Sequence, residues 1–216
     1  GAGRTIKVFK GRRHGFMPVY MKHAVAGDRD WEETIAPLLS SSTPDRWNDF
    51  DAHAAGIRDA MRQGKFIRQY CVGGYMYLRA LVGPEDICYM FVDNPGLIHK
   101  MMQAWLALAE AVTTRAQSLG VVYDEFFIGE DICYNHGLLI SPDMVREFLL
   151  PYYRQILASI RSRQQGHLLH FQVDTDGNVG NAIDLYREVG MDVMSPFEIA
   201  AGNDLLALAR KYPDLV

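Results

Sequence analysis

Carboxylates gather in one stretch of this chain, from His170 to Gly202, which reads HFQVDTDGNVGNAIDLYREVGMDVMSPFEIAAG. Asp174 and Asp176 follow one predicted strand, and Glu198 follows the next. In a parallel α/β architecture the carboxyl ends of the strands meet on one face, where active sites are built. Carboxylates in that position act as general bases, as hydrogen-bond acceptors for a substrate or as metal ligands. The pattern favours an enzyme over a binding scaffold, although it does not name the reaction.

The first of these strands carries polar residues at alternate positions. Alternation puts His170, Gln172 and Asp174 on the same face of the strand. Polar groups on a buried strand are costly unless they bind something, so we expect these three to line a site. Glu198 would join Asp174 and His170 there as a base, a hydrogen-bond acceptor or a metal ligand. The segment 176–178 (Asp-Gly-Asn) is either part of that site or a turn with a helix cap.

Two earlier strands also end in residues that could bind a ligand. Gly73 and Gly74 follow a strand at 66–72, where they would allow a ligand to approach the backbone and offer helix N–H groups to an anion. A tight strand-to-helix turn explains the two glycines slightly better. Glu130 and Asp131 follow a strand at 121–128, and neighbours on an extended strand point to opposite sides. We expect Asp131 to face the site.

Strands alternate with helices through most of the chain. The hydrophobic spacing and the capping residues predict strands at 66–72, 121–128, 167–173 and 192–196, with helices at 51–63, 75–81, 84–91, 95–118, 141–160, 182–189 and 203–211. This order indicates a parallel sheet with right-handed crossovers. Four such strands are half of the eight that a (β/α)8 barrel needs. An open doubly wound sheet has no support, because no strand is followed by a GxGxxG or GxxxxGK[ST] sequence.

We expect residues 1–216 to form a single domain. Residues 1–64 would supply a hairpin with strands at 5–9 and 16–21, a loop at 11–15, and helices, and residues 65–216 would supply successive β/α units. The chain opens without a methionine and ends in what reads as the start of another strand. We therefore expect a fragment of a longer barrel.

Composition excludes several classes of protein. The chain has 216 residues, 49% of them hydrophobic and 22% charged, with a net charge of −4, so no basic field favours nucleic acid or an anionic membrane. No apolar run is long enough to span a bilayer. The three cysteines, Cys71, Cys88 and Cys133, have no metal-ligand spacing, which is typical of reduced thiols in a cytoplasmic protein.

The segment 139–153, LISPDMVREFLLPYY, resembles the SP-x-x-[YF]-REF-x-LPY helix start of the uroporphyrinogen decarboxylase superfamily. Val145 departs from that pattern at its aromatic position. The segments 173–178 (VDTDGN) and 196–202 (PFEIAAG) resemble a less studied bacterial branch of the same superfamily. The resemblance runs from about Phe66 to the end and implies a (β/α)8 TIM barrel, present here in part, with its pocket at the carboxyl ends of the strands.

This superfamily includes the decarboxylase of haem biosynthesis and zinc-dependent methyltransferases that act on methylated corrinoid proteins. The arginine-rich N-terminal motif and early-strand aspartate of the decarboxylases have no match here, and Gly129-Glu130-Asp131 stands where they carry Phe-Asp-Ser. The methyltransferases hold zinc through His-x-Cys and a later cysteine. His170 matches that histidine, but Gln172 stands at the cysteine position.

The resemblance and the strand ends together give a leading hypothesis of a uroporphyrinogen decarboxylase-like enzyme acting on a tetrapyrrole or another polar, carboxylated small molecule. The residues expected to be catalytic are Asp131, Asp174 and Glu198. Those expected to bind substrate are Gly73, Gly74, Gln172, Asp176 and Asn178.

Two alternatives stay open. One is corrinoid-dependent methyl transfer, with a corrinoid protein as partner and with a divalent metal such as zinc, held by His170 and nearby carboxylates, activating a thiol. The other is a non-catalytic fragment or binding module, because half a barrel exposes two sheet edges that need a cover or a partner. A homodimer is one candidate assembly.

Overall fold

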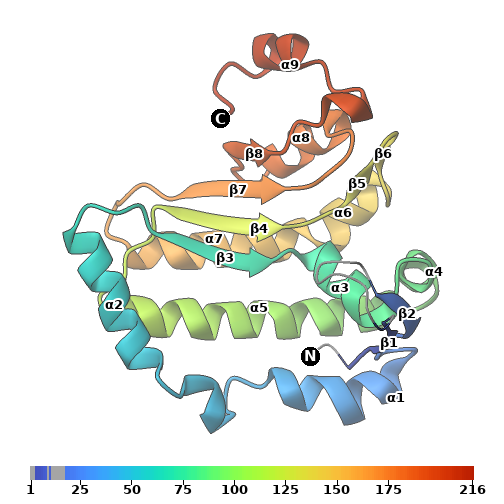
Figure 1. Cartoon of the computed structure of the whole chain (residues 1–216), viewed down its shortest axis with the longest axis horizontal. Coiled ribbons are helices and arrows are strands. Elements are labelled where there is room, and N and C mark those ends of the chain that lie inside the picture. Colours follow the sequence, from blue (N-terminus) through green and yellow to red (C-terminus); the bar gives the residue numbers. More distant parts are fainter. Residues whose placement is uncertain (1–2, 9, 11–17) are drawn as a thin grey trace.

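A four-stranded parallel sheet forms the centre of the computed structural model, which describes residues 3–8, 10 and 18–216. Its strands are β3 (Arg68–Val72), β4 (Glu125–Gly129), β7 (His170–Asp174) and β8 (Val193–Ser195), side by side in that order. All four point the same way, so their carboxyl ends share one edge (Figure 1). The predicted parallel α/β sheet is confirmed, as an architecture consistent with part of a barrel. The described residues do not close a full barrel.

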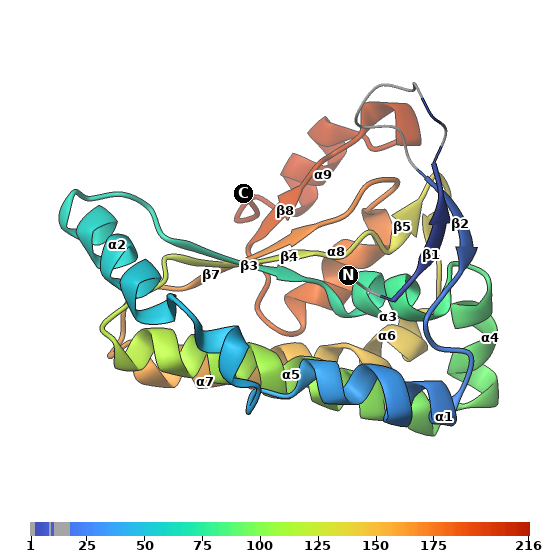
Figure 2. The same ribbon diagram turned by 60° about the horizontal axis from the view of Figure 1, so that its bottom comes forward.

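Helices connect the strands and cover one face of the sheet. They are α3 (Gly74–Val82), α4 (Asp86–Asp93), α5 (Pro95–Ser118), α6 (Pro142–Phe148), α7 (Leu150–Arg163) and α8 (Gly180–Arg187). A further helix, α9 (Leu205–Lys211), follows the last strand. The long helices α5 and α7 lie side by side along that face (Figures 1 and 2). A short antiparallel hairpin, β5 (Cys133–Tyr134) with β6 (Gly137–Leu138), follows β4 and was not predicted from the sequence.

The helix α5 follows its sequence signals closely. The Asn94 side chain accepts a hydrogen bond from the backbone N–H of Leu97 at 3.2 Å, and Pro95 occupies the first turn, where no N–H is needed. The apolar stripe then recurs at helical spacing, so one side of α5 is buried. The buried residues on it include Leu97, Ile98, Met101, Met102 and Trp105.

The two faces of the sheet differ in chemistry. The face toward the helices carries Phe126, Ile128, Phe171 and Val173, all fully buried. The opposite face, which we call the open face, carries charged, polar and aromatic side chains in register, and Tyr70 on it is 57% exposed. Beyond the last strand, Val216 accepts a hydrogen bond from the N–H of Met194 in β8 and donates one to the carbonyl of Asp192, just before β8, each at 3.0 Å.

The predicted long helix at 141–160 is broken at Leu149. α6 begins as expected, because the Ser141 hydroxyl accepts a hydrogen bond from Met144 N at 3.1 Å. Pro151 then removes a backbone donor and its ring clashes with the preceding turn, so a second helix, α7, starts at Leu150. The apolar face continues across the break.

The strand β4 starts later than the predicted 121–128. The side-chain amide of Gln164 bonds both backbone groups of Tyr123, accepting from its N–H at 2.9 Å and donating to its carbonyl at 3.0 Å. The Gln164 amide therefore makes the backbone hydrogen bonds of Tyr123 that a neighbouring strand would otherwise make, so β4 begins only at Glu125. The predicted strands at 66–72 and 167–173 are likewise trimmed at their N-terminal ends, to β3 and β7.

The N-terminal part contains the strands of the expected hairpin, β1 (Thr5–Lys7) and β2 (Val19–Lys22), paired antiparallel. The predicted loop at 11–15 lies outside the described residues. A helical stretch follows, made of α1 (Asp28–Asp30), a π-helical turn (Trp31–Ile35) and 3-10 turns at Ala36–Leu39 and Pro44–Trp47, and then α2 (Phe50–Arg62). Across the described ranges, no helix combines the length and apolar character needed to cross a bilayer.

Candidate functional site

The loops that follow β4, β7 and β8 are hydrogen-bonded to one another at the carboxyl edge of the sheet. The buried Thr175 hydroxyl accepts hydrogen bonds from the backbone N–H groups of Ile132 and Cys133 at 3.1 and 3.0 Å. The Glu198 carboxylate accepts from Gly177 N at 2.6 Å. These bonds fix the loop after β7 against both of its neighbours.

Asn203 makes three of the hydrogen bonds that join these loops. The sequence did not predict this role, because Asn203 reads there only as a helix start. Its buried side chain accepts from Val179 N at 3.0 Å and donates to the carbonyls of Gly177 and Glu198 at 2.8 and 2.9 Å. Asn178 adds a bond from its amide to the Ala201 carbonyl at 3.1 Å. The predicted ligand-binding Asn178 therefore also ties the two loops together.

Four of the predicted carboxylates come together at this edge, and we call them the carboxylate edge: Asp131, Asp174, Asp176 and Glu198. Asp176 is exposed, yet partial desolvation and the charges of Asp131, Glu198 and Asp174 raise its pKa. A carboxylate whose pKa is raised by its neighbours is a better proton acceptor than an ordinary aspartate.

Two of these carboxylates have partners and one more is held by backbone. Asp131 pairs with Arg79 of α3, whose guanidinium lies 3.4 Å from its carboxylate and 3.3 Å from its backbone carbonyl. Asp174 accepts a hydrogen bond from the Ser195 hydroxyl at 2.8 Å. Glu198 is held by Gly177, as described above. Asp176 makes no side-chain hydrogen bond within the described part of the chain, which leaves it the most available of the four.

A hydrogen-bonded chain crosses the open face and ends at Asp174. Arg68 pairs with Glu125 and donates to Gln172 at 3.2 Å, and Gln172 donates to the Ser195 hydroxyl at 2.7 Å. Ser195 in turn donates to Asp174. We expected the polar residues of this strand to require a ligand, but the neighbouring strands satisfy them instead. Gln172 is thus held in place between Arg68 and Ser195, and this series of hydrogen bonds orients the Asp174 carboxylate.

His170 does not join the carboxylates, although it shares the face of β7 with Asp174. It starts the strand and Asp174 ends it, so the two lie about 13 Å apart along β7. Its Nδ1 contacts the Asp192 carboxylate at 2.7 Å. Among the described residues no cluster of His, Cys, Asp or Glu side chains could hold a metal ion. With Gln172 at the cysteine position as well, the residues present do not fit the His-x-Cys zinc site expected from the sequence resemblance.

Gly73 and Gly74 have a structural reason for lacking side chains. A Cβ on Gly73 would lie 1.7 Å from Oε2 of Glu130, and a Cβ on Gly74 would lie 2.9 Å from the Tyr153 hydroxyl. The Gly74 N–H donates to that hydroxyl at 2.5 Å, so it is not free for an anion. The tight-turn interpretation of the two glycines is therefore the better supported one.

Glu130 is the residue that the sequence analysis underrated. Its side chain is completely buried on the helix side of the sheet, where Oε1 accepts from the hydroxyls of Tyr153 and Tyr186, both at 2.7 Å. Oε2 makes no hydrogen bond of ordinary geometry among the described residues. Burial raises the pKa of Glu130 to about 7, although the two tyrosines and the backbone of Tyr75 favour its charged form. The alternation of side chains could have predicted that Glu130 faces the helices, since Phe126, Ile128 and Glu130 share one side of the strand.

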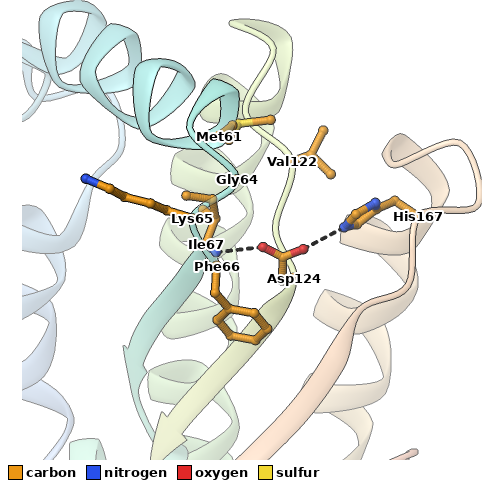
Figure 3. Close-up of a pocket in the computed structure, with 8 residues that line it drawn as sticks. All are labelled: Met61, Gly64, Lys65, Phe66, Ile67, Val122, Asp124 and His167. Atoms are coloured by element: carbon orange, nitrogen blue, oxygen red, sulfur yellow. Dashed lines mark hydrogen bonds and ion pairs between the residues drawn. The ribbon is translucent and has the colours of Figure 1, made fainter.

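A pocket of about 330 Å³ lies at the opposite end of the strands, around Asp124 (Figure 3). One Asp124 oxygen accepts from Ile67 N at 2.6 Å and the other lies 2.9 Å from Nε2 of His167. Both carboxylate oxygens are therefore used to join the starts of β3 and β7 to β4. The amino end of parallel strands serves stability more than chemistry, so we place the candidate site at the carboxylate edge.

Comparison with known proteins finds a likeness to solved structures alone. No family model and no curated protein matches the chain. Among solved structures, a methyltransferase from Methanosarcina mazei superposes with a TM-score of 0.59 at 16% sequence identity. The match covers 90% of this chain and 52% of the methyltransferase, so the chain spans about half the length of that structure. At this identity the likeness shows the fold alone.

Proposed function

We propose that this chain is part of a methyl-transferring enzyme of the uroporphyrinogen decarboxylase superfamily and that its site is the carboxylate edge. The observation that carries the proposal is the charge of that edge, where desolvation and the charges of Asp131, Glu198 and Asp174 raise the pKa of Asp176. The fold likeness to a methyltransferase supports the same choice.

The charge of the edge argues against a polycarboxylate as substrate. A decarboxylase acting on such a molecule needs cations to hold its carboxylates. Arg79 is paired with Asp131, and Arg68 is paired with Glu125 and Gln172. Four carboxylates would repel a carboxylated tetrapyrrole, so the decarboxylase hypothesis stays a prediction with less support than methyl transfer.

Methyl transfer from a corrinoid to a thiol requires a group that accepts the thiol proton. The sulfur attacks the methyl carbon, the cobalt–carbon bond breaks, and its electron pair stays with the corrinoid. The thiol proton passes to a carboxylate, and Asp176 suits this role because it is exposed and its pKa is raised. Asp174, fixed by Ser195, would orient the acceptor. No step requires a metal held by this chain.

The test is turnover of methylcobalamin with a small thiol such as 2-mercaptoethanol, followed by the visible spectrum of the corrinoid. Asp176→Asn should slow demethylation while the fold, checked by circular dichroism, is unchanged. The matched control is Asp143→Asn, an exposed aspartate at the start of α6. A parallel incubation with uroporphyrinogen decides between the hypotheses. Decarboxylation of that substrate without methyl transfer would overturn the proposal, and no turnover of either would favour a non-catalytic module.

A further inference from the structure

Glu130 and Asp131 are neighbours in sequence, and both are tied to helix α3. Behind the sheet, the Tyr153 hydroxyl donates to Glu130 and accepts from the N–H of Gly74, the first residue of α3. In front, Arg79 of the same helix bonds the carboxylate and the carbonyl of Asp131. Helix α3 is therefore hydrogen-bonded, through Tyr153, to the buried carboxyl of Glu130 and, through Arg79, to Asp131 at the carboxylate edge.

The Glu130 side chain has no room to move alone. Its backbone N–H donates to the Asp174 carbonyl at 2.7 Å, which fixes the residue to the end of β7. Its Oε2 lies against Gly73, 1.7 Å from the position that a Cβ there would occupy. The following residue, Asp131, has a φ of +47°, a conformation that non-glycine residues rarely adopt. A change in the bonding of the carboxyl must therefore be taken up by the turn at Gly73 and Gly74.

We propose that Glu130 is a positioning residue that takes up and releases one proton and thereby sets how α3 holds Arg79 against Asp131. In the protonated form the neutral carboxyl accepts both tyrosine hydroxyls at Oε1. Loss of the proton puts charge on a completely buried group, which strengthens the hydrogen bond from Tyr153 and polarises the bond that the Gly74 N–H makes to the Tyr153 hydroxyl. This inference rests on the geometry and not on the proposed reaction.

Among the described residues, the other titratable groups that face Glu130 behind the sheet keep their protons at neutral pH. These are Cys71 of β3, Tyr75 of α3, Cys133 of β5, Tyr153 of α7 and Tyr186 of α8, whereas the adjacent Asp131 lies in front of the sheet. Burial raises the pKa of Cys71 and of Tyr75 to about 12 and that of Cys133 to about 11. Burial also raises the pKa of Tyr153 and Tyr186 well above the ordinary value. These thiols and phenols stay protonated at neutral pH.

The Gly74 amide reports directly on this proton, because it donates to the hydroxyl that contacts Glu130. We expect its proton resonance to move downfield as the pH rises, with a midpoint near 7. Glu130→Gln should abolish the inflection. Tyr186→Phe removes one donor that favours the charged carboxylate, so it should raise the midpoint by about one pH unit.

The matched control is Tyr152→Phe, on the same helix as Tyr153 but bonded to His99, which should leave the midpoint unchanged. An inflection that survives Glu130→Gln, or a Gly74 resonance without inflection in a protein folded from pH 5 to 9, would overturn the proposal. If Glu130→Gln does not fold, the two phenylalanine variants decide: equal midpoints in both would also overturn it. These readouts do not use turnover, so failure of the proposed reaction is separable from failure of this inference.

Discussion

Replacing Glu130 by glutamine should change how stability depends on pH. The pKa of Glu130 rises from an ordinary value of 4.5 to about 7 on folding, because burial disfavours the charged form. The folded protein therefore holds this proton more tightly than the unfolded chain does. The stabilisation is fully present below about pH 4.5 and is lost as the pH rises through about 7.

The size of the effect follows from the same two pKa values. Raising the pKa from 4.5 to about 7 corresponds to about 3 kcal/mol, since one pH unit is worth about 1.4 kcal/mol. Glutamine carries no charge and can offer its carbonyl to Tyr153 and Tyr186. We therefore expect the stability of Glu130→Gln relative to wild type to increase by about 3 kcal/mol between pH 4.5 and 8.

Urea denaturation at several pH values between 4.5 and 8 measures this difference. Taking the variant minus wild type removes the titration of all other groups that the two proteins share. Glu85→Gln, at an exposed position before α4, is the matched control and should stay parallel to wild type. If Glu130→Gln also stays parallel to wild type, or loses stability relative to it as the pH rises, the account of a buried carboxyl holding a proton is refuted.

Three further changes test the packing of the edge and its chemistry. Gly73→Ala should lower the free energy of unfolding by about 3 kcal/mol or more, because the added Cβ would meet the carboxyl and backbone of Glu130. The control Gly56→Ala, on α2 with open space around it, should be neutral or stabilising. Urea denaturation of both variants measures the difference. Asn203→Ala should lower stability by about 2 kcal/mol, since three backbone partners lose their bonds, and an unchanged melting temperature would contradict that role. Asp174→Asn should reduce methyl transfer on the order of 100-fold with the fold retained, and full activity would remove Asp174 from the site.

Local sequence signals predicted most elements well. The Asn94-Pro95 pair and an uninterrupted apolar stripe gave α5 with its observed ends, and Ser141 gave the start of α6. Errors arose where a side chain from elsewhere replaced backbone bonding. Gln164 took the backbone bonds of Tyr123 and shortened β4, and the hairpin β5–β6 has only two residues in each strand, too few for periodicity to show.

The sequence by itself determined which carboxylates reach the edge of the sheet, because parallel strands must end together and each of these residues follows a strand end. It also determined that His170, Gln172 and Asp174 share a face, since side chains alternate along a strand. Only the tertiary structure decided what each polar group does there. Arg68 and Ser195 are far from Gln172 in sequence, and Gly177 is far from Glu198. These contacts make Gln172 part of a hydrogen-bond network and make Glu198 hold the loop after β7.

The same holds for the acidic pair at the end of β4. Alternation required Glu130 and Asp131 to face opposite ways, but it could not say that two tyrosines from α7 and α8 would enclose Glu130. Burial depends on packing between helices that are distant in the chain, and burial is what makes the proton affinity of this carboxyl unusual. The pattern of residues thus indicated where the carboxylates gather, and the packing of the helices decided which carboxyl has a pKa near 7.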